Sequence, residues 1–410
     1  MKRLNTYLCG PTVYNSPHIG NMRPIVFFDI LLRAHSALGV IINFVHNITD
    51  IDDKIIEKAI HENQSEKNIS EKYFLEYINL LKEFNIQTPT HLEKVTDNLE
   101  VIDSYIQKVQ ANNFTYKSNE DILFNIANLK KYGEVSNQKL DMLISQETIN
   151  INKKQSQDFV LWKKTSKGIK FDSSFGKGRP GWHTECAALI DKHFGAKGVD
   201  IHGGGIDLKF PHHENENAQH LAIYNKSITK KWMWTGLINI NEQKMSKSLN
   251  NFLLAKDFLK QYPADLFRLI ILNSSFNSVI NLNDELISNN LKLLNRFKTL
   301  HNNFQAENPK WKFQMIEDKE ILEIMELVAN VKFAQANLKI MSLFNEALKN
   351  DKAKIKIFTL WKKLGFLFMN SEIPLHIHEI YKNWKKSRNL KNFLKADQFR
   401  EILKKNLIIF

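Results

Sequence analysis

The chain has 410 residues, of which 43% are hydrophobic and 25% charged; this mixture excludes fibrous and disordered chains and allows two or three domains. Lys and Arg number 57 against 44 Asp and Glu, so the net charge of +13 favours a polyanionic partner. No stretch reaches the roughly 20 uninterrupted apolar residues of a membrane span. The first residues lack a signal-peptide pattern, and we expect a cytoplasmic protein without a membrane partner.

Basic charge is concentrated in the last sixty residues, and the chain has only two cysteines. Residues 351–410 contain fourteen Lys and Arg but five Asp and Glu, so +9 of the net charge lies in this last segment. The two cysteines are Cys9 and Cys186, and in a reducing compartment a lone disulfide is the weaker interpretation of that pair.

The first ninety residues alternate between strand and helix patterns. Hydrophobic spacing predicts a strand and turn over Leu4–Tyr14, a helix over Asn21–Leu38 and a strand over Val40–Val45. This order is a βαβ unit, which indicates a parallel sheet.

A second stretch with the same alternation follows a long polar segment. It predicts a helix at Thr184–Phe194, a strand at Val199–His202, a turn at Gly203–Gly205, a helix from about Pro211 and a strand at Leu237–Ile240. The simplest account is one parallel sheet split by an insertion.

The patterns together predict an α/β fold followed by a helical bundle. The polar insertion contains a strand candidate at Asp121–Phe124, and from Asp265 onward almost every window has helical spacing. Neither the G-x-G-x-x-G pattern nor the P-loop pattern occurs, so a nucleotide would have to be held in another way.

A candidate metal-binding pair lies in the segment Phe210–Glu216, which reads F-P-H-H-E-N-E. If Pro211 opens a helix, His212 and Glu216 stand on one face, where a nitrogen and an oxygen can bind one metal ion. His213 would point about 100° away from them. Taken alone, this spacing is more often a solvated helix face.

The two cysteines add further candidate ligands. Cys186 lies near the start of a predicted helix, and Cys9 ends the first strand, at the edge where parallel sheets place their ligands. Two thiolates, one imidazole and one carboxylate form a sensible zinc set, in which His183 or Glu214 could replace a residue already named. The alternative is that both cysteines are buried small hydrophobic residues.

A phosphate-binding candidate lies at the junction of the first strand and helix, Ser16–Asn21. Helix N-terminal N–H groups attract phosphate, and Gly20 permits close approach of the backbone. His18 and Asn21 can donate hydrogen bonds to charge that develops on a phosphate. The alternative is a capped helix start without a ligand.

A cationic segment with the sequence K-M-S-K-S occupies residues 244–248. Lys244 and Lys247 could neutralise a triphosphate, and catalysis would require that neutralisation to grow in the transition state. A solvated turn is the alternative. A specified string of five residues, however, arises by chance in on the order of one in ten thousand chains of this length.

Together these residues resemble the signatures of class I aminoacyl-tRNA synthetases, and of their cysteinyl family in particular. The tetrad His18–Asn21 is similar to the H-I-G-H signature, with asparagine in the last position, and residues 244–248 match K-M-S-K-S letter for letter. Further family-like blocks are Cys9–Tyr14, Asn47–Lys54, Gly178–Cys186 and Phe210–Glu216. The resemblance is strong from Thr6 to about Asn251 and patchy through the helical half.

The resemblance implies a Rossmann-type catalytic domain with an insertion and a helical domain that approaches the tRNA anticodon. The implied segments are two halves of the catalytic domain at 1–91 and 175–240, an insertion at 92–174, a KMSKS and stem-contact region at 241–288, and a basic helical tRNA-binding domain at 289–410. The implied activity is an ATP-dependent cysteine–tRNA ligase that forms cysteinyl-adenylate and transfers cysteine to the 3′ end of tRNA(Cys). We expect a monomer that uses Mg²⁺ with ATP.

Carried over residue by residue, the resemblance also implies a set of site residues. One zinc ion would be held by Cys9, Cys186, His212 and Glu216. Catalysis and ATP binding would use His18, Gly20, Asn21, Lys244 and Lys247, with the lysines on a loop that closes over pyrophosphate. The cysteine substrate would be bordered by Thr49, Trp182 and Asp207.

Two other functions fit parts of the pattern. A related family joins cysteine to a glucosaminyl-inositol in mycothiol synthesis and would share the zinc and ATP sites, but its small acceptor gains nothing from a basic tail. A catalytically silent tRNA-binding paralogue is disfavoured by the intact K-M-S-K-S string and the four ligand candidates. Asn21 departs from the signature histidine, and we expect modest consequences because an amide can still donate.

Overall fold

The computed structural model describes residues 2–87, 89–137, 153–245 and 251–409. The chain forms two compact units. The first comprises Met1–Ile25, Ile41–Leu81 and Thr88–Leu237, and the second comprises Val26–Val40, Lys82–Gln87 and Ile238–Phe410. Within the described residues, no helix is both long enough and apolar enough to cross a membrane.

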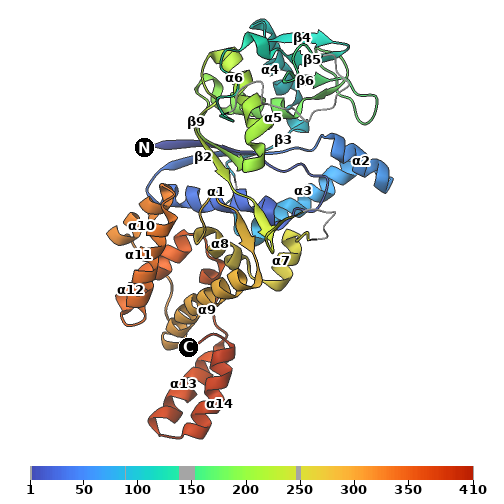
Figure 1. Cartoon of the computed structure of the whole chain (residues 1–410). Coiled ribbons are helices and arrows are strands. Elements are labelled where there is room, and N and C mark those ends of the chain that lie inside the picture. The colour runs from blue at the N-terminus through green and yellow to red at the C-terminus, as the bar shows by residue number, and fades with distance from the viewer. Residues whose placement is uncertain (1, 88, 138–152, 246–250, 410) are drawn as a thin grey trace. The chain divides into compact units, whose positions relative to one another are not determined.

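A five-stranded parallel sheet organises the first unit (Figure 1). Its strands, in spatial order, are β3 (His91–Lys94), β2 (Ile41–Ile48), β1 (Arg3–Leu8), β8 (Val199–Gly205) and β9 (Thr229–Thr235). All neighbouring pairs are parallel. The strand order reverses between β1 and β8, and open α/β sheets bind their ligands at such a reversal. The predicted parallel sheet with an insertion is confirmed.

Two local predictions about this sheet are wrong. Gly203–Gly205 does not turn the chain but continues β8, paired with residues 233–235 of β9. Glycine serves close packing here, because a Cβ on Gly204 would lie 3.0 Å from the His213 ring. The strand predicted at Leu237–Ile240 lies in another sheet, and β9 is the edge strand. The lysines Lys230 and Lys231 interrupt the apolar pattern of β9, as an edge position allows.

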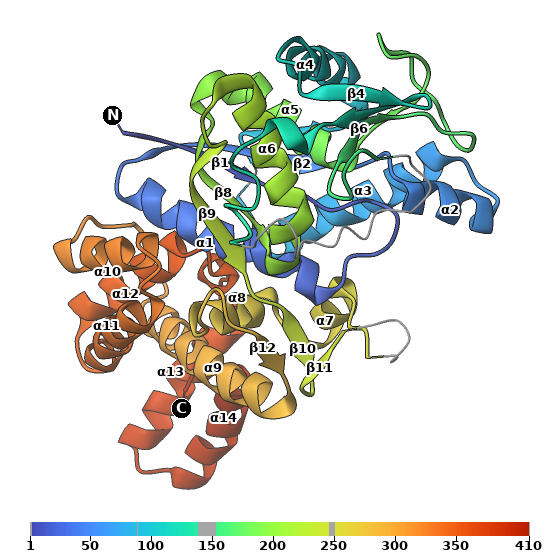
Figure 2. The same cartoon turned by 45° about the horizontal axis from the view of Figure 1, so that its top comes forward.

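A second, antiparallel sheet in the first unit has the order β4-β5-β6-β7. Its strands are β4 (Thr115–Ser118), β5 (Asp121–Phe124), β6 (Phe159–Lys163) and β7 (Arg179–Pro180), which confirms the strand predicted at 121–124. Among the described residues, the α-helices wholly within this unit are α2 (Asp53–Glu62), α4 (Leu99–Ala111), α5 (Trp182–Phe194) and α6 (Glu214–Tyr224), while α3 (Glu66–Glu83) starts in it. One buried core joins residues of both sheets with α4, α5 and α6. Figure 2 labels these three helices together with strands of both sheets.

The second unit is mostly helical, as predicted. It includes most of α1 (Ile19–Ala37) and a small sheet of β11 (Gln243–Lys244), β10 (Ile238–Ile240) and β12 (Ile280–Leu282). Its other helices are α7 (Ala255–Gln261), α8 (Ala264–Leu272), α9 (Asp284–Glu307), α10 (Lys319–Ala329), α11 (Phe333–Ala347), α12 (Asp351–Lys363), α13 (Leu375–Asn389) and α14 (Phe393–Lys405). Side-chain caps from Asn283, Asp318 and Asn350 satisfy N–H groups at the starts of α9, α10 and α12.

Helices α13 and α14 form a hairpin with a small core of its own. Ile377, Tyr381 and Leu403 are buried between the two helices and the end of α9. Near the connection between the helices, Phe393 and Leu394 are 64% and 86% exposed. The hairpin is therefore anchored at its base and presents apolar side chains at its tip.

Candidate metal centre and substrate site

The carboxyl edge of the parallel sheet brings two distant segments together at the reversal of strand order. Cys9 directly follows β1, and its backbone N–H donates to the carbonyl of Gly203 in β8 at 3.1 Å. Helix α5 carries Cys186, which is buried. The segment Lys209–His213, a π-type turn, leads into α6, which carries Glu216.

The four predicted zinc ligands converge at this edge. One ligand atom from each of Cys9, Cys186, His212 and Glu216 lies within 4.8 Å of all the others. The Cys9 sulfur is 3.8 Å from the Cys186 sulfur, 3.5 Å from His212 Nε2 and 3.5 Å from Glu216 Oε1. The side chains come from three distant parts of the sequence, since His212 and Glu216 share one segment, and the fold brings these parts together.

The spacing of these atoms suits one tetrahedral metal ion. Two thiolates bound to zinc at about 2.3 Å each lie about 3.8 Å apart, which is the distance between the two sulfurs here. His212 Nε2 and Glu216 Oε1 are closer, at 2.7 Å, and form a hydrogen bond. Thiolate, imidazole and carboxylate are the ligand types that zinc takes in proteins.

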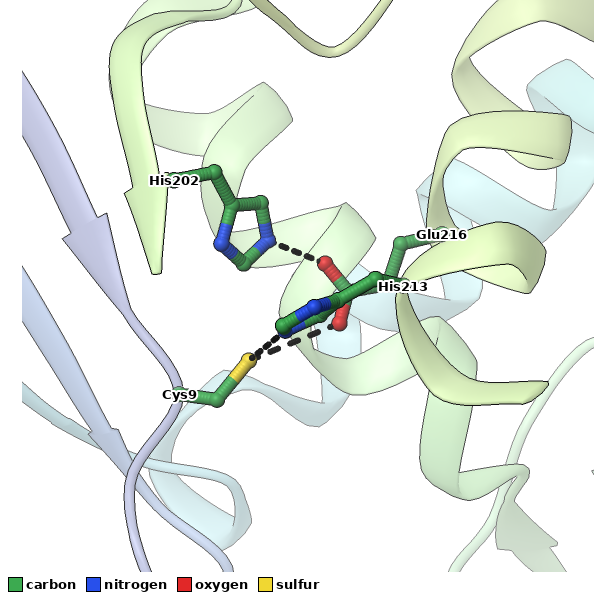
Figure 3. Close-up of side chains that lie close together, drawn as sticks. All are labelled: Cys9, His202, His213 and Glu216. Atoms are coloured by element: carbon green, nitrogen blue, oxygen red, sulfur yellow. Dashed lines mark hydrogen bonds and ion pairs between the residues drawn. The ribbon is translucent and has the colours of Figure 1, made fainter. Parts of the chain in front are cut away.

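A second ligand set overlaps the first. Cys9 and Glu216 also lie within 4.8 Å of ring nitrogens of His202 and His213 (Figure 3). His213 Nε2 is 3.4 Å from the Cys9 sulfur, and the two oxygens of Glu216 contact different rings, Oε2 that of His202 and Oε1 that of His212. Trp234 Nε1 donates to His213 Nδ1 at 2.8 Å, which fixes the orientation of that ring.

The prediction that His213 points away from the cluster is therefore wrong. It assumed a regular α-helix from Pro211, but α6 begins at Glu214 and Phe210 has non-helical φ and ψ angles within the preceding turn. From this irregular turn both imidazoles reach the Cys9 sulfur, His212 Nε2 at 3.5 Å and His213 Nε2 at 3.4 Å. His202 is not among the residues predicted from the sequence, although its strand ends at the same sheet edge.

The charges within the cluster are unbalanced in a way that favours a cation. Burial and the neighbouring Cys186 raise the pKa of Cys9. Burial also acts to raise the pKa of Cys186, but hydrogen bonds with Cys9 and His212 outweigh it and lower that pKa to about 6. Despite burial, His202 and His212 hold the pKa of Glu216 well below its usual value. Despite burial, Glu216 also raises the pKa of His212 to about 10. Two buried anions thus share one imidazolium, and a divalent ion would complete the balance.

His183 and Glu214, which the sequence allowed as replacement ligands, are not among the four side chains that converge. His183 Nδ1 is 3.1 Å from His212 Nδ1, so it contacts a candidate ligand on the side away from Glu216. The Glu214 carboxylate accepts hydrogen bonds from the backbone N–H groups of Gly133 and Ser136, at 2.9 and 2.7 Å. Glu214 therefore links the loop around Gly133 and Ser136, which belongs to the insertion, to the start of α6 by hydrogen bonds.

Of the three predicted substrate residues, Trp182 directly contacts a member of the cluster. The Trp182 ring is 40% exposed and stacks on His212 with centroids 4.3 Å apart. Thr49 is buried, and its hydroxyl donates to Glu185, the neighbour of Cys186, at 3.0 Å. Asp207 is exposed on the short 3₁₀ turn Ile206–Leu208 after β8.

The phosphate-binding candidate forms the start of α1. Asn21 Oδ1 accepts from the backbone N–H of His18 at 3.0 Å, which leaves its amide nitrogen to serve as a donor. Burial lowers the pKa of His18 to about 4, and the charge of Asp207 opposes this shift only in part. At neutral pH His18 is therefore an uncharged hydrogen-bonding group. Gly20 is half-buried in the first turn of α1.

The K-M-S-K-S segment is described only at its start. Lys244 is exposed in β11, and its carbonyl accepts from Asn251 Nδ2 at 3.1 Å. Lys247 lies outside the described residues, so its predicted role stays a prediction.

Comparisons with known proteins agree with the resemblance seen in the sequence. A family model described as tRNA synthetases class I (C) catalytic domain matches residues 1–292. The chain is 45% identical over 403 residues to a cysteine–tRNA ligase of Mesomycoplasma hyopneumoniae strain 232, with 98% of this chain and 97% of the relative covered. It is 40% identical to the cysteine–tRNA ligase of Malacoplasma penetrans, with 98% and 94% covered.

Solved structures of other class I synthetases share the fold. A methionyl-tRNA synthetase of Mycobacterium tuberculosis in complex with methionyl-adenylate matches with a TM-score of 0.63 at 12% identity, covering 94% of each chain. A leucyl enzyme of Agrobacterium radiobacter in a ternary complex with tRNA gives a TM-score of 0.62 at 10% identity, covering 88% of this chain and 83% of that one.

Proposed function

The chain belongs to the cysteine–tRNA ligases of the class I tRNA synthetase family, and on this premise we propose which of its residues carry each part of the reaction. The enzyme activates cysteine with ATP and transfers it to tRNA. The cysteine carboxylate attacks the α-phosphorus of ATP and releases pyrophosphate, and a ribose hydroxyl at the 3′ end of tRNA then displaces AMP from cysteinyl-adenylate. Positioning and charge neutralisation supply most of the rate, since little covalent chemistry falls to side chains.

One zinc ion per chain would be held by Cys9, Cys186, His212 and Glu216. The sulfur separation of 3.8 Å supports this set, because it equals the separation expected at a tetrahedral zinc. The set also contains two thiolates, whereas the overlapping set with His202 and His213 contains one. In this assignment His202 orients Glu216 through the second carboxylate oxygen, as partners outside the ligand shell commonly do.

A pair of variants separates the two ligand sets, because Cys186 and His213 each belong to one set alone. We expect Cys186→Ser to lose more than about 100-fold in zinc affinity, measured by competition with a chelator, because a thiolate ligand is removed. His213→Gln should lose much less. The reverse order of the two effects would assign the metal to the other set, and circular dichroism of each variant would establish that both are folded.

Zinc binding would explain how cysteine is selected over serine, which differs from it by one atom. A pocket that relied on shape alone could discriminate by only about 1–3 kcal/mol. Bound zinc prefers and deprotonates a thiol, so coordination energy would be added to shape. The exposed Trp182 ring beside His212, together with Thr49 and Asp207, would border the bound amino acid.

The test compares zinc K-edge absorption spectra with and without cysteine, alongside adenylate formation with serine. We expect cysteine to add one sulfur ligand to the metal and serine to be activated far more slowly. An unchanged sulfur count, or activation of serine within tenfold of cysteine, would contradict selection by the metal.

ATP would be held at the start of α1 and by the K-M-S-K-S segment. Neutral His18 and the amide of Asn21 would donate to the phosphates beside Gly20, while Lys244 and Lys247 would neutralise the pyrophosphate as it leaves. Mg²⁺ would accompany the triphosphate, as is usual for nucleotides.

The hairpin of α13 and α14 would contribute to binding of tRNA(Cys). It carries most of the basic residues of the C-terminal segment and exposes Phe393 at its tip. Exposed aromatic rings stack on unpaired bases, and lysines neutralise phosphates. We further propose that the enzyme acts as a monomer in the cytoplasm, where its tRNA is found.

A cysteine ligase of mycothiol synthesis remains a less favoured alternative. The relatives that match across nearly the whole chain, including the helical half, bear the name of tRNA ligases. Mass analysis of the cysteine-dependent product would distinguish an aminoacylated tRNA from an amide of a sugar amine. A silent paralogue would show no cysteine-dependent exchange of pyrophosphate into ATP.

A further inference from the structure

A second group of metal-binding side chains lies at the opposite end of helix α5 from Cys186. His91 and Glu93 belong to β3, the edge strand of the parallel sheet, and His193 lies in the last turn of α5. One ligand atom from each of the three lies within 4.8 Å of the other two. Because Glu93 follows His91 by two residues in a strand, both side chains stand on the same face of the sheet.

The three side chains are already arranged in contact. The rings of His91 and His193 are 4.4 Å apart between centroids and tilted by 37°. His193 Nε2 lies 2.6 Å from Glu93 Oε1. The Glu93 and His193 side chains are 13% and 11% exposed, so the group is accessible to ions but partly shielded from water.

We propose that His91, Glu93 and His193 form a second, peripheral site for a divalent transition-metal ion of the zinc or nickel class. Two imidazoles and one carboxylate are a common ligand set for such ions, and three protein ligands leave room for water.

The ammonium group of Lys192 would compete with a metal ion for the carboxylate of Glu93. Its ammonium lies 3.0 Å from both carboxylate oxygens of Glu93 and 2.7 Å from Asn98 Oδ1. The Lys192 side chain is 35% exposed, and its long stem allows the ammonium to move into solvent. A metal ion that binds Glu93 must therefore displace or repel this charge, which predicts an affinity below that of the buried cluster.

The bound ion would link the edge strand β3 to the last turn of α5, the helix that carries the candidate zinc ligand Cys186. Helix α5 carries Cys186 in its first half and His193 in its last turn. Joining His193 to β3 would restrain this helix against the sheet, and binding to the folded state alone would raise the melting temperature.

The test titrates Ni²⁺ into the full-length, zinc-loaded chain by calorimetry, with metal analysis to show that the zinc is retained. We expect one site, weakened at least about tenfold by His193→Phe, since losing a ligand should cost no less than losing a partner of a ligand. The phenyl ring preserves the stacking on His91. Lys192→Met should act in the opposite direction and tighten Ni²⁺ binding severalfold, a gain that a folding defect could not produce.

His61→Ala is the matched control, because His61 is exposed on α2 and away from the cluster. This variant should bind Ni²⁺ like the parent chain. Equal Ni²⁺ affinity in the parent and in His193→Phe, or no tightening in Lys192→Met, would show that the three residues form only a hydrogen-bonded ion pair and would overturn the proposal.

Discussion

Two buried charged clusters in this molecule have opposite characters. In the second unit, the Asp29 carboxylate accepts from Arg268 at 2.6 Å, from Arg33 at 2.8 Å and from the backbone N–H of Gln87 at 2.6 Å. Arg268 also donates to backbone carbonyl oxygens, through Nη1 to that of Leu364 at 3.1 Å and through Nη2 to that of Phe84 at 2.9 Å. Every charge in this network has a protein partner of the opposite sign or a dipole.

The cluster in the first unit is unbalanced. Cys186 and Glu216 are two buried anions against a single imidazolium on His212. A closed network such as that of Asp29 stabilises one packing arrangement, whereas an excess of buried anions requires a cation from outside. The comparison gives a way to distinguish a structural ion pair from a binding site. In a structural ion pair the donors and acceptors of the protein already satisfy one another, whereas in a binding site they do not.

The largest expected effect on stability comes from removing one charged partner from the Asp29 network. Arg268→Met should lower the free energy of unfolding by about 3–5 kcal/mol, because it removes the buried partner of Asp29 and leaves only the more exposed Arg33 to balance that carboxylate. Urea denaturation would measure the loss, and zinc content should be unchanged. Lys339→Met is the control, since it removes the exposed pair with Glu323 and should have no measurable effect. Equal effects of the two variants would show that burial does not decide the strength of these pairs.

A charge that acts only during the reaction should affect rate and leave stability unchanged. We expect Lys247→Ala to slow adenylate formation by about 10²–10³-fold, the usual cost of losing one group that stabilises transition-state charge. The ATP dissociation constant should change little. Pre-steady-state release of pyrophosphate measures the first quantity. Lys260→Ala, which removes an exposed lysine paired with Asp257, serves as the control. A rise in the dissociation constant alone would contradict the assigned role.

Acid should weaken both units for the same reason. Burial lowers the pKa of His46 in the first unit and of His301 in the second to about 4. Both rings are neutral when folded but titrate near 6.5 when unfolded, so stability is complete above pH 6.5 and falls as the pH drops toward 4. The loss is up to about 3 kcal/mol for each group.

A single substitution isolates this effect in the second unit. In His301→Phe the aromatic contacts with Phe358 and Phe368 can persist, and the decline of unfolding free energy between pH 6.5 and 4 should become shallower. His61→Phe, at an exposed position, should leave the decline as it is. An identical decline in the parent chain and His301→Phe would assign the acid sensitivity to other groups.

Much of the fold follows from patterns that neighbouring residues set. Alternating hydrophobic runs predicted β1, α1 and β2, and helical spacing predicted the second unit, because burial of one face determines those elements locally. Strand β9 was not predicted, since its lysines are tolerated only because it lies at the edge of the sheet. That position is a property of the assembled topology.

The candidate site shows the same division. Ligand chemistry and resemblance suffice to choose Cys9, Cys186, His212 and Glu216 from the sequence. They do not suffice for His202, whose contact with Glu216 appears only once β8 and α6 are placed side by side, or for His213, whose approach depends on the irregular turn before α6. The charge imbalance of the cluster likewise emerges only when all its members are placed.

The smallest expected effect concerns the most exposed charges, those of the hairpin formed by α13 and α14. Substituting Lys391 and Lys395 by glutamine should reduce the salt dependence of tRNA binding, with the slope of log affinity against log salt falling by about 0.7–0.9 for each phosphate that the lysines no longer neutralise. Both lysines are exposed near the tip, so the fold should be kept. Pyrophosphate exchange driven by cysteine should be unaffected, since tRNA takes no part in that half-reaction.

Exchanging Lys349 and Lys352 for glutamine provides the matched control, because these lysines are equally exposed but lie between α11 and α12 or at the start of α12. Both double variants change the net charge by the same amount, so a general electrostatic attraction between a basic protein and RNA would flatten the two salt slopes equally. Only a direct contact of the hairpin with tRNA makes the Lys391 and Lys395 variant the more affected of the two. Equal slopes would therefore assign the hairpin charges to solubility and long-range attraction.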